Sequence, residues 1–186
     1  MKNSRIAQQG LVLLGCGKMG SAMLAGWLDQ GLPATSVHVL DPFPSDWLKS
    51  TDVALNSDLP DAPAIVLVAV KPQMMAEALP RLQEMGGGET VFVSVAAGTT
   101  IGYFESVLGR ETPVVRAMPN TPAAIGKGIT AVIGNAAVSN EGVDEAVQLL
   151  QAVGQVVRLE NEGQIDAVTG VSGSGPAYVF HMIETL

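Results

Sequence analysis

Residues 11–20 read LVLLGCGKMG, and this stretch decides the fold class of the 186-residue chain. The four apolar residues 11–14 are typical of a buried strand, and they lead directly into Gly15, Gly17 and Gly20. A helical pattern follows, so the spacing is G-x-G-x-x-G between a strand and a helix. This context predicts the first strand–turn–helix unit of a parallel α/β sheet.

Each glycine of the loop has a physical reason to be there. Gly15 permits the tight turn, Gly17 lets a pyrophosphate approach the backbone, and Gly20 allows the helix to pack closely on the strand. The amides at the helix N-terminus then attract the phosphates. The loop therefore predicts a dinucleotide site, although glycine-rich turns also serve S-adenosylmethionine enzymes and arise by chance.

An acidic residue follows at the distance that a dinucleotide site requires. Asp41 directly follows the stretch VHVL at 37–40 and lies 21 positions after Gly20. At this position a carboxylate can accept hydrogen bonds from ribose hydroxyls. In that role it favours NAD, because the 2′-phosphate of NADP would face a carboxylate with no adjacent Arg or Lys. The alternative is that Asp41 only caps the turn before Pro42.

Short β-branched segments alternate with helical patterns over the first two thirds of the chain. We predict strands at residues 11–14, 37–40, 65–70, 91–95, 114–117 and 129–133, and helices at residues 19–30, 73–85 and 101–108. Several strands are apolar throughout, which suits a sheet covered on both faces. The expected fold is a Rossmann-like, doubly wound, mostly parallel sheet.

The pattern changes after Gly134. A helix is expected over residues 140–153 with Ser139 as its N-cap, then a last strand at 155–159. We predict a dinucleotide-binding domain over residues 1–160 and the beginning of a helical domain over 161–186. Pro176 suits the first turn of a helix that has no stop signal by Leu186, so the rest of the helical domain is expected beyond this chain.

Composition excludes several classes of function. The net charge of −8 and the pI near 4.6 argue against nucleic-acid binding. Without an apolar run of 18 residues, and with MKNSRIAQQG at the start, we expect a cytoplasmic protein with no membrane segment. Cys16 is the single cysteine, so neither an intrachain disulfide nor a structural zinc site is expected; it is a space-filling residue or, alternatively, a reactive thiol.

Four further segments resemble pyrroline-5-carboxylate reductases. They are AVKPQ at 69–73, VAAGTTI at 95–101, RAMPNTPAAIGKG at 116–128 and DAVTGVSGSGPAYVF at 166–180. The last is the most specific, because the others recur loosely in the wider group of proteins similar to 6-phosphogluconate dehydrogenase. Together with the glycine loop, these motifs cover the chain from residue 11 almost to its end.

The resemblance implies a set of cofactor-binding positions. They are Leu14, Gly15, Cys16, Gly17, Lys18, Met19, Gly20, Asn56, Ala69, Val70, Lys71, Pro72, Val95, Ala96 and Ala97. The loops at 69–72 and 95–97 also follow the carboxyl ends of predicted strands, where ligands bind in open α/β sheets. Lys71 comes directly after a buried strand, so it either lines the cofactor or extends into solvent.

Positions nearer the substrate remain open to two interpretations each. The rigid turn RAMPNTP would hold Met118 and Asn120 against the nicotinamide, or it simply ends a strand. Glu162 matches a family acid near the substrate, or is an ordinary acid in a helix's first turn. The amides around Ser172 and Gly173 precede a helix and would bind a substrate carboxylate, or they serve capping and close packing.

The resemblance implies reduction of 1-pyrroline-5-carboxylate to L-proline with NADP or NAD as cofactor, in a homodimer or larger homo-oligomer. In the family, the substrate carboxylate is held chiefly by a later helical region, so activity of this chain alone is doubtful. We predict no catalytic residue and no metal, and expect His38 and His181 to be structural.

One alternative function is that of a module that binds dinucleotide without turnover. A β-hydroxyacid dehydrogenase relative is the other, but it needs a Lys in a later helix, and none follows Lys127.

Overall fold

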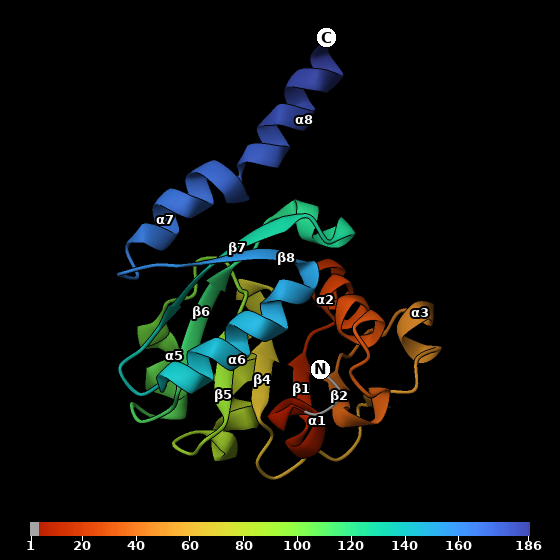
Figure 1. Ribbon diagram of the computed structural model, residues 1–186, viewed down its shortest axis with the longest axis vertical. Helices are drawn as coiled ribbons and strands as arrows, with labels where there is room; N and C mark the ends of the chain where they lie inside the picture. Colours follow the sequence, from red (N-terminus) through yellow and green to blue (C-terminus); the bar gives the residue numbers. More distant parts are fainter. Residues whose placement is uncertain (1–3) are drawn as a thin grey trace.

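The computed structural model describes residues 4–186, and its centre is one sheet of eight strands in the order β3-β2-β1-β4-β5-β6-β7-β8 (Figure 1). The strands are β1 Leu11–Leu14, β2 Val37–Leu40, β3 Ala54–Leu55, β4 Ile65–Val68, β5 Val91–Ser94, β6 Val114–Met118, β7 Gly128–Gly134 and β8 Gly154–Arg158. The expected Rossmann-like, mostly parallel sheet is confirmed, since every neighbouring pair from β3 to β6 is parallel.

The strand order reverses at β1. Leu11 pairs with Val37 of β2 on one side and with Ile65 of β4 on the other. The loops after β1 and β4 therefore diverge to opposite sides and leave a crevice at the carboxyl edge of the sheet. This topology is what gathers the glycine loop and the other predicted segments at one edge.

The simple alternation of strand and helix fails at β7, which is antiparallel to β6. The two strands are joined through only a short 3-10 helix, η4 Thr121–Ile125. A parallel crossover needs a dozen or more residues, so this connection returns the chain as a hairpin-like pair. After α6, Asn140–Leu150, β8 lies parallel to β7.

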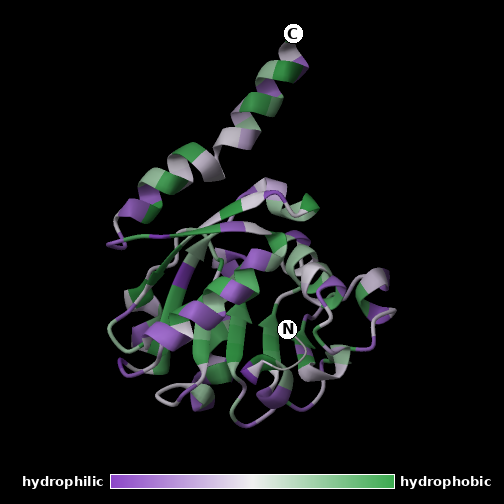
Figure 2. Ribbon diagram, in the orientation of Figure 1, coloured by the Kyte–Doolittle hydropathy of each residue, from purple (hydrophilic) through white to green (hydrophobic). Residues whose placement is uncertain are grey.

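The apolar strands serve two cores, one on each face of the sheet. Leu11 and Leu13 belong to the core under α2, Lys18–Asp29, and α6, whereas Val12 and Leu14 face the core under α5, Ile101–Leu108. Alternation of side chains along a strand explains why residues facing both ways are apolar. Figure 2 shows the central strands as hydrophobic along their length.

The sequence patterns predicted two helices that are longer than those in the structure. Residues 73–85 form three short pieces, η2 Pro72–Met74, α4 Met75–Ala78 and η3 Leu79–Met85. Pro80 has no N–H to donate, which weakens a continuous α-helix at this point. The expected helix over 140–153 likewise ends at Leu150 and continues as η5 Gln151–Val153.

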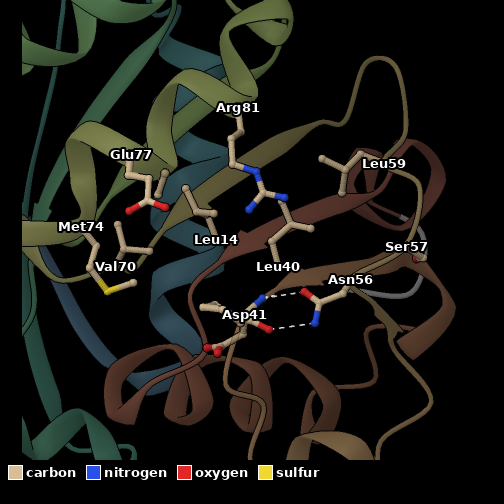
Figure 3. Close-up of a pocket in the computed structure, with 12 residues that line it drawn as sticks. Leu14, Leu40, Asp41, Asn56, Ser57, Leu59, Val70, Met74, Glu77 and Arg81 are labelled. Atoms are coloured by element: carbon tan, nitrogen blue, oxygen red, sulfur yellow. Dashed lines mark hydrogen bonds between the residues drawn. The ribbon is translucent and has the colours of Figure 1, made fainter.

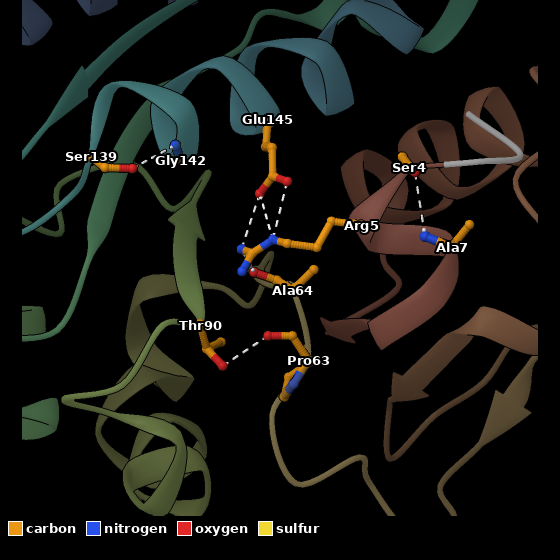
Figure 4. Close-up of polar contacts among 9 residues, drawn as sticks. All are labelled: Ser4, Arg5, Ala7, Pro63, Ala64, Thr90, Ser139, Gly142 and Glu145. Atoms are coloured by element: carbon orange, nitrogen blue, oxygen red, sulfur yellow. Dashed lines mark hydrogen bonds and ion pairs between the residues drawn. The ribbon is translucent and has the colours of Figure 1, made fainter.

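Two helices and β3 were not predicted because they are too short to show a period. They are α1 Arg5–Gln9 and α3 Asp46–Lys49. Arg5 holds α1 against the body of the protein, since its guanidinium pairs with Glu145 of α6 at 3.0 Å and donates to the Ala64 carbonyl (Figure 4). Residues 1–3, part of the segment assessed for a signal sequence, lie outside the described residues.

The last segment lies beyond the sheet. It comprises α7 Gln164–Val168, a π-helical stretch at Thr169–Gly173, called η6, and α8 Gly175–Thr185. Figure 1 shows α8 projecting away from the sheet, and Figure 2 shows hydrophobic residues along it. Within residues 4–186, no helix is long and apolar enough to cross a membrane.

Candidate functional site

Two of the three glycines in the loop after β1 are required by the fold itself. Gly15 has φ +89°, and a Cβ there would stand 2.9 Å from Val70 Cγ1. A Cβ at Gly20 would collide with the Gly15 carbonyl oxygen. These positions therefore make the turn and the close contact of α2 with the end of β1.

Gly17 differs from its neighbours because nothing in the fold requires it to be glycine. Its φ is −70°, and a Cβ built there would meet no atom within 4 Å. It is the N-cap of α2, so the first amides of that helix open onto the same space. The loop thus has the open cradle and unpaired helix amides that a pyrophosphate group would need.

Cys16 is buried in the loop. Burial raises the pKa of its thiol, a hydrogen bond with Ser21 Oγ lowers it, and the nearby Asp41 carboxylate raises it again, with burial the largest effect. The net pKa is above the ordinary value of 9.0, so the thiol stays protonated near neutral pH. The structure therefore supports the space-filling interpretation of Cys16.

Asp41 connects the end of β2 to the glycine loop. Its Oδ2 accepts the Cys16 N–H at 2.7 Å, and its Oδ1 accepts the Phe43 N–H at 2.7 Å. The second bond is the turn cap considered from the sequence, whereas the first reaches across to the adjacent strand end. Because carboxylate oxygens have further lone pairs, capping and a ribose contact are compatible.

Asn56 holds the backbone of Asp41 from the other side. Its side-chain oxygen accepts the Asp41 N–H at 2.9 Å, and its Nδ2 donates to the Asp41 carbonyl at 2.8 Å. Its φ of +50° makes it the single non-glycine residue with positive φ among residues 4–186. Asn tolerates this conformation better than most residues, so the structure has a local reason for Asn here.

A cavity of about 440 Å³ lies above this pair (Figure 3). Its walls are Leu14, Leu40, Asp41, Pro42, Asn56, Ser57, Leu59, Val70, Met74, Glu77, Ala78 and Arg81. Leu14, Asp41, Asn56 and Val70 were predicted as cofactor residues, and they meet here. Arg81 was not predicted, because a search for a cation beside Asp41 in the sequence does not reach a residue forty positions away.

The loop that follows β4 lies beside the glycine loop, and the loop that follows β5 lies beside the end of β4. The Ala69 N–H donates to the Leu14 carbonyl at 2.8 Å, and the Val95 N–H donates to the Val68 carbonyl at 3.0 Å. Ala96 is buried, but Lys71 and Ala97 are exposed. The Lys71 ammonium group forms no ion pair with another described residue, so the structure leaves both interpretations of Lys71 open.

The two residues predicted in the turn after β6, Met118 and Asn120, contact other parts of the protein. The Asn120 side-chain oxygen accepts the Ile129 N–H at 2.9 Å, which ties the turn to β7. Met118 contacts the C-terminal segment, because a Cβ on Gly173 would stand 2.8 Å from Met118 Cε. A residue expected near the nicotinamide and one expected near the substrate are therefore adjacent.

Glu162 is anchored to the sheet domain by its own carboxylate. Its Oε1 accepts from Arg116 Nη1 at 2.7 Å and from the Ile101 N–H at 2.8 Å. No described residue is bonded to Oε2. The sequence analysis did not predict Arg116 as the ion-pair partner of Glu162, because the two residues are 46 positions apart and no local pattern connects them.

Ser172 and Gly173 lie in η6, not at the first turn of α8. Ser172 Oγ is buried and has no hydrogen-bond partner among the described residues. These residues are separated from the cavity at Asp41, which contains neither of them. The predicted residues thus form one group around Asp41, whereas Glu162 and Gly173 lie against Arg116 and Met118 of β6, respectively.

The sheet order and the glycine loop define the class, a Rossmann-type oxidoreductase domain. Residues 10–98 match the family model of NADP oxidoreductase, coenzyme F420-dependent, and residues 162–186 match that of the pyrroline-5-carboxylate reductase dimerisation domain.

Comparison with individual proteins identifies the family within this class of oxidoreductase. The chain is 37% identical to pyrroline-5-carboxylate reductase of Pseudomonas aeruginosa, covering 95% of this chain and 67% of that one. It is 40% identical to the Mycobacterium tuberculosis enzyme, covering 95% and 63%. The structure superposes on the Coxiella burnetii reductase with a TM-score of 0.85 at 30% identity, covering 96% and 68%.

A second solved structure, Plasmodium falciparum pyrroline carboxylate reductase with NADP bound, gives a TM-score of 0.85 at 27% identity, covering 97% of this chain and 68% of that one. This chain belongs to the pyrroline-5-carboxylate reductase family. It spans about two thirds of the length of these relatives.

Proposed function

We propose that this chain is the cofactor-binding portion of an enzyme that reduces 1-pyrroline-5-carboxylate to L-proline with NADH or NADPH, the last step of proline biosynthesis. The observation that carries the proposal is the open cradle at Gly17 beside the Asp41–Asn56 cavity. Family membership supplies the substrate class.

In this proposal the glycine loop binds the pyrophosphate through the amides at the start of α2, and Asp41 accepts a ribose hydroxyl. The loops at 69–72 and 95–97 and the Met118 side chain line the path toward the nicotinamide. Glu162, Ser172 and Gly173 lie nearest the substrate. Asn120 supports the turn and takes part through its bond to Ile129.

The bound cofactor would supply a hydride to the carbon of the C=N bond. A protonated cyclic imine that accepts this hydride becomes the neutral secondary amine. No side chain therefore needs to donate a proton in the same step. The protein's contribution is alignment of two flat rings and exclusion of water. The uncommitted Oε2 of Glu162 is suited to face the cationic imine nitrogen.

We further propose that residues 1–160 form the dinucleotide-binding domain and that 161–186 begin the domain through which subunits associate. The match of 162–186 to the dimerisation model supports association between copies. The exposed apolar side chains of α8, including Phe180 at 62% exposure, are consistent with it. A cytoplasmic location stays a prediction.

The test is a pair of measurements on the purified chain. Fluorescence titration with NADH and NADPH measures binding, and disappearance of the reduced nicotinamide absorbance in the presence of pyrroline-5-carboxylate measures turnover. Binding together with imine reduction supports the full proposal. Binding without reduction favours a module that holds dinucleotide without turnover, and failure to bind either dinucleotide contradicts the proposed function.

A further inference from the structure

Among residues 4–186, Arg81 is the one cationic residue that lines the Asp41 cavity. It lies in η3, after β4, whereas the carboxylate and amide below it come from β2 and the segment after β3. Its guanidinium makes no hydrogen bond or ion pair with any described residue. Figure 3 shows the group extending into the cavity from η3, over the side chain of Leu40.

The nearest candidate for an intramolecular partner does not take that role. Glu77 is four residues before Arg81 and also lines the cavity, a spacing at which an Arg–Glu pair readily forms on a continuous helix. Here α4 ends at Ala78 and a 3-10 helix follows, which changes the direction of side chains along this stretch. Figure 3 shows Glu77 on the side of Met74, away from the guanidinium.

The cavity divides into a polar end and an apolar end. Asp41 and Asn56 form the polar end, where their bonds to one another and to the glycine loop leave acceptors suited to a ribose. Leu14, Leu40 and Leu59 line the opposite end, and Glu77 lies at its border beside Met74. An apolar slot next to a ribose-binding end accommodates a flat aromatic base.

A planar guanidinium over such a slot can stack on a π-system, which a solvated ammonium does less well. We propose that Arg81 stacks its guanidinium on the adenine ring of the bound dinucleotide and closes the slot opposite the leucines. This inference rests on the proposed function, because it requires the dinucleotide site. Stacking involves the base alone, so Arg81 contributes equally to the binding of NADH and NADPH.

The experiment compares Arg81→Ala and Arg81→Lys with the unchanged chain, using NADH, NADPH and ADP as ligands in calorimetric titrations. Arg110→Ala is the matched control, since Arg110 is also exposed and has no ion-pair partner among the described residues, but lies outside the cavity. We expect Arg81→Ala to lower the affinity for all three ligands by the same factor, about three- to tenfold. Arg81→Lys should show most of the same loss of affinity as Arg81→Ala, and the control variant should bind all three ligands as the unchanged chain does.

Other outcomes overturn the inference in distinguishable ways. A loss confined to NADPH and restored by Arg81→Lys would show that the cation binds the 2′-phosphate. Unchanged binding of all three ligands would show a solvated side chain. If the unchanged chain binds neither dinucleotide, the proposed function fails together with the inference. Melting temperatures of the variants establish that each is folded.

Discussion

Arg116 and Glu162, 46 positions apart in the sequence, form an ion pair of 2.7 Å between β6 and the loop before α7. The Arg116 side chain is 7% exposed and the Glu162 side chain 32%. The same carboxylate oxygen accepts the first amide of α5. One side chain therefore secures the start of the C-terminal segment to two elements of the sheet domain.

Removal of Glu162 should destabilise the chain, because it leaves the buried Arg116 charge and the Ile101 amide without an acceptor. A fully buried pair would cost about 3–5 kcal/mol when broken, and partial exposure of Glu162 reduces this to about 1–3 kcal/mol. Urea denaturation of Glu162→Ala measures the loss. The matched control is Glu160→Ala, whose exposed side chain bonds to no other described residue; equal stability of the two variants would contradict the prediction.

Gly17→Val should separate cofactor binding from folding. The new side chain enters open space at a φ that valine adopts, so the expected cost is roughly 1 kcal/mol for a poorer N-cap. Binding of NADH and NADPH should be lost, because the side chain occupies the pyrophosphate's approach. Gly20→Ala is the comparison variant, and it should lose stability because its Cβ meets the Gly15 carbonyl. Retained affinity in Gly17→Val would show that the cradle does not bind pyrophosphate.

Cys16 should make stability fall in alkaline solution. The pKa of the thiol is raised in the folded chain, chiefly by burial, so the folded state holds the proton more tightly than the unfolded state. The contribution is complete below the ordinary thiol pKa of 9.0 and is lost as pH rises through the higher folded value. The free energy of unfolding, measured from pH 7 upward, should decline more steeply for the unchanged chain than for Cys16→Ala. Parallel pH profiles would count against this.

Self-association should depend on α8. Its side chains Tyr178, Phe180, Met182 and Ile183 are each between 56% and 62% exposed, and an apolar face of that extent favours contact with another copy. Ile183→Glu should shift the chain toward monomer in sedimentation velocity, without lowering the melting temperature of the sheet domain, because α8 projects away from it (Figure 1). Glu184→Gln is the adjacent control. An unchanged association constant in Ile183→Glu would exclude α8 from the interface.

Much of the fold followed from local pattern. The boundaries of β1 and β2 and of α5 were predicted to the residue, because apolar strands next to glycine or proline turns and a Thr-capped helix are local signals. The glycine spacing and the position of Asp41 likewise predicted a dinucleotide-binding edge. The boundaries of short elements such as α1 and β3 had no such signal, since their stability comes from contacts like the Arg5–Glu145 pair.

The sequence by itself determined the class of sheet, the position of the glycine loop and the family, because each depends on residues close together along the chain. Only the tertiary structure decided which distant side chains meet. It brought Arg81 over the Asp41 cavity, paired Arg116 with Glu162, and set Gly173 against Met118. Such contacts are fixed by the order and twist of strands and by the packing of loops at their carboxyl ends, which no local pattern encodes.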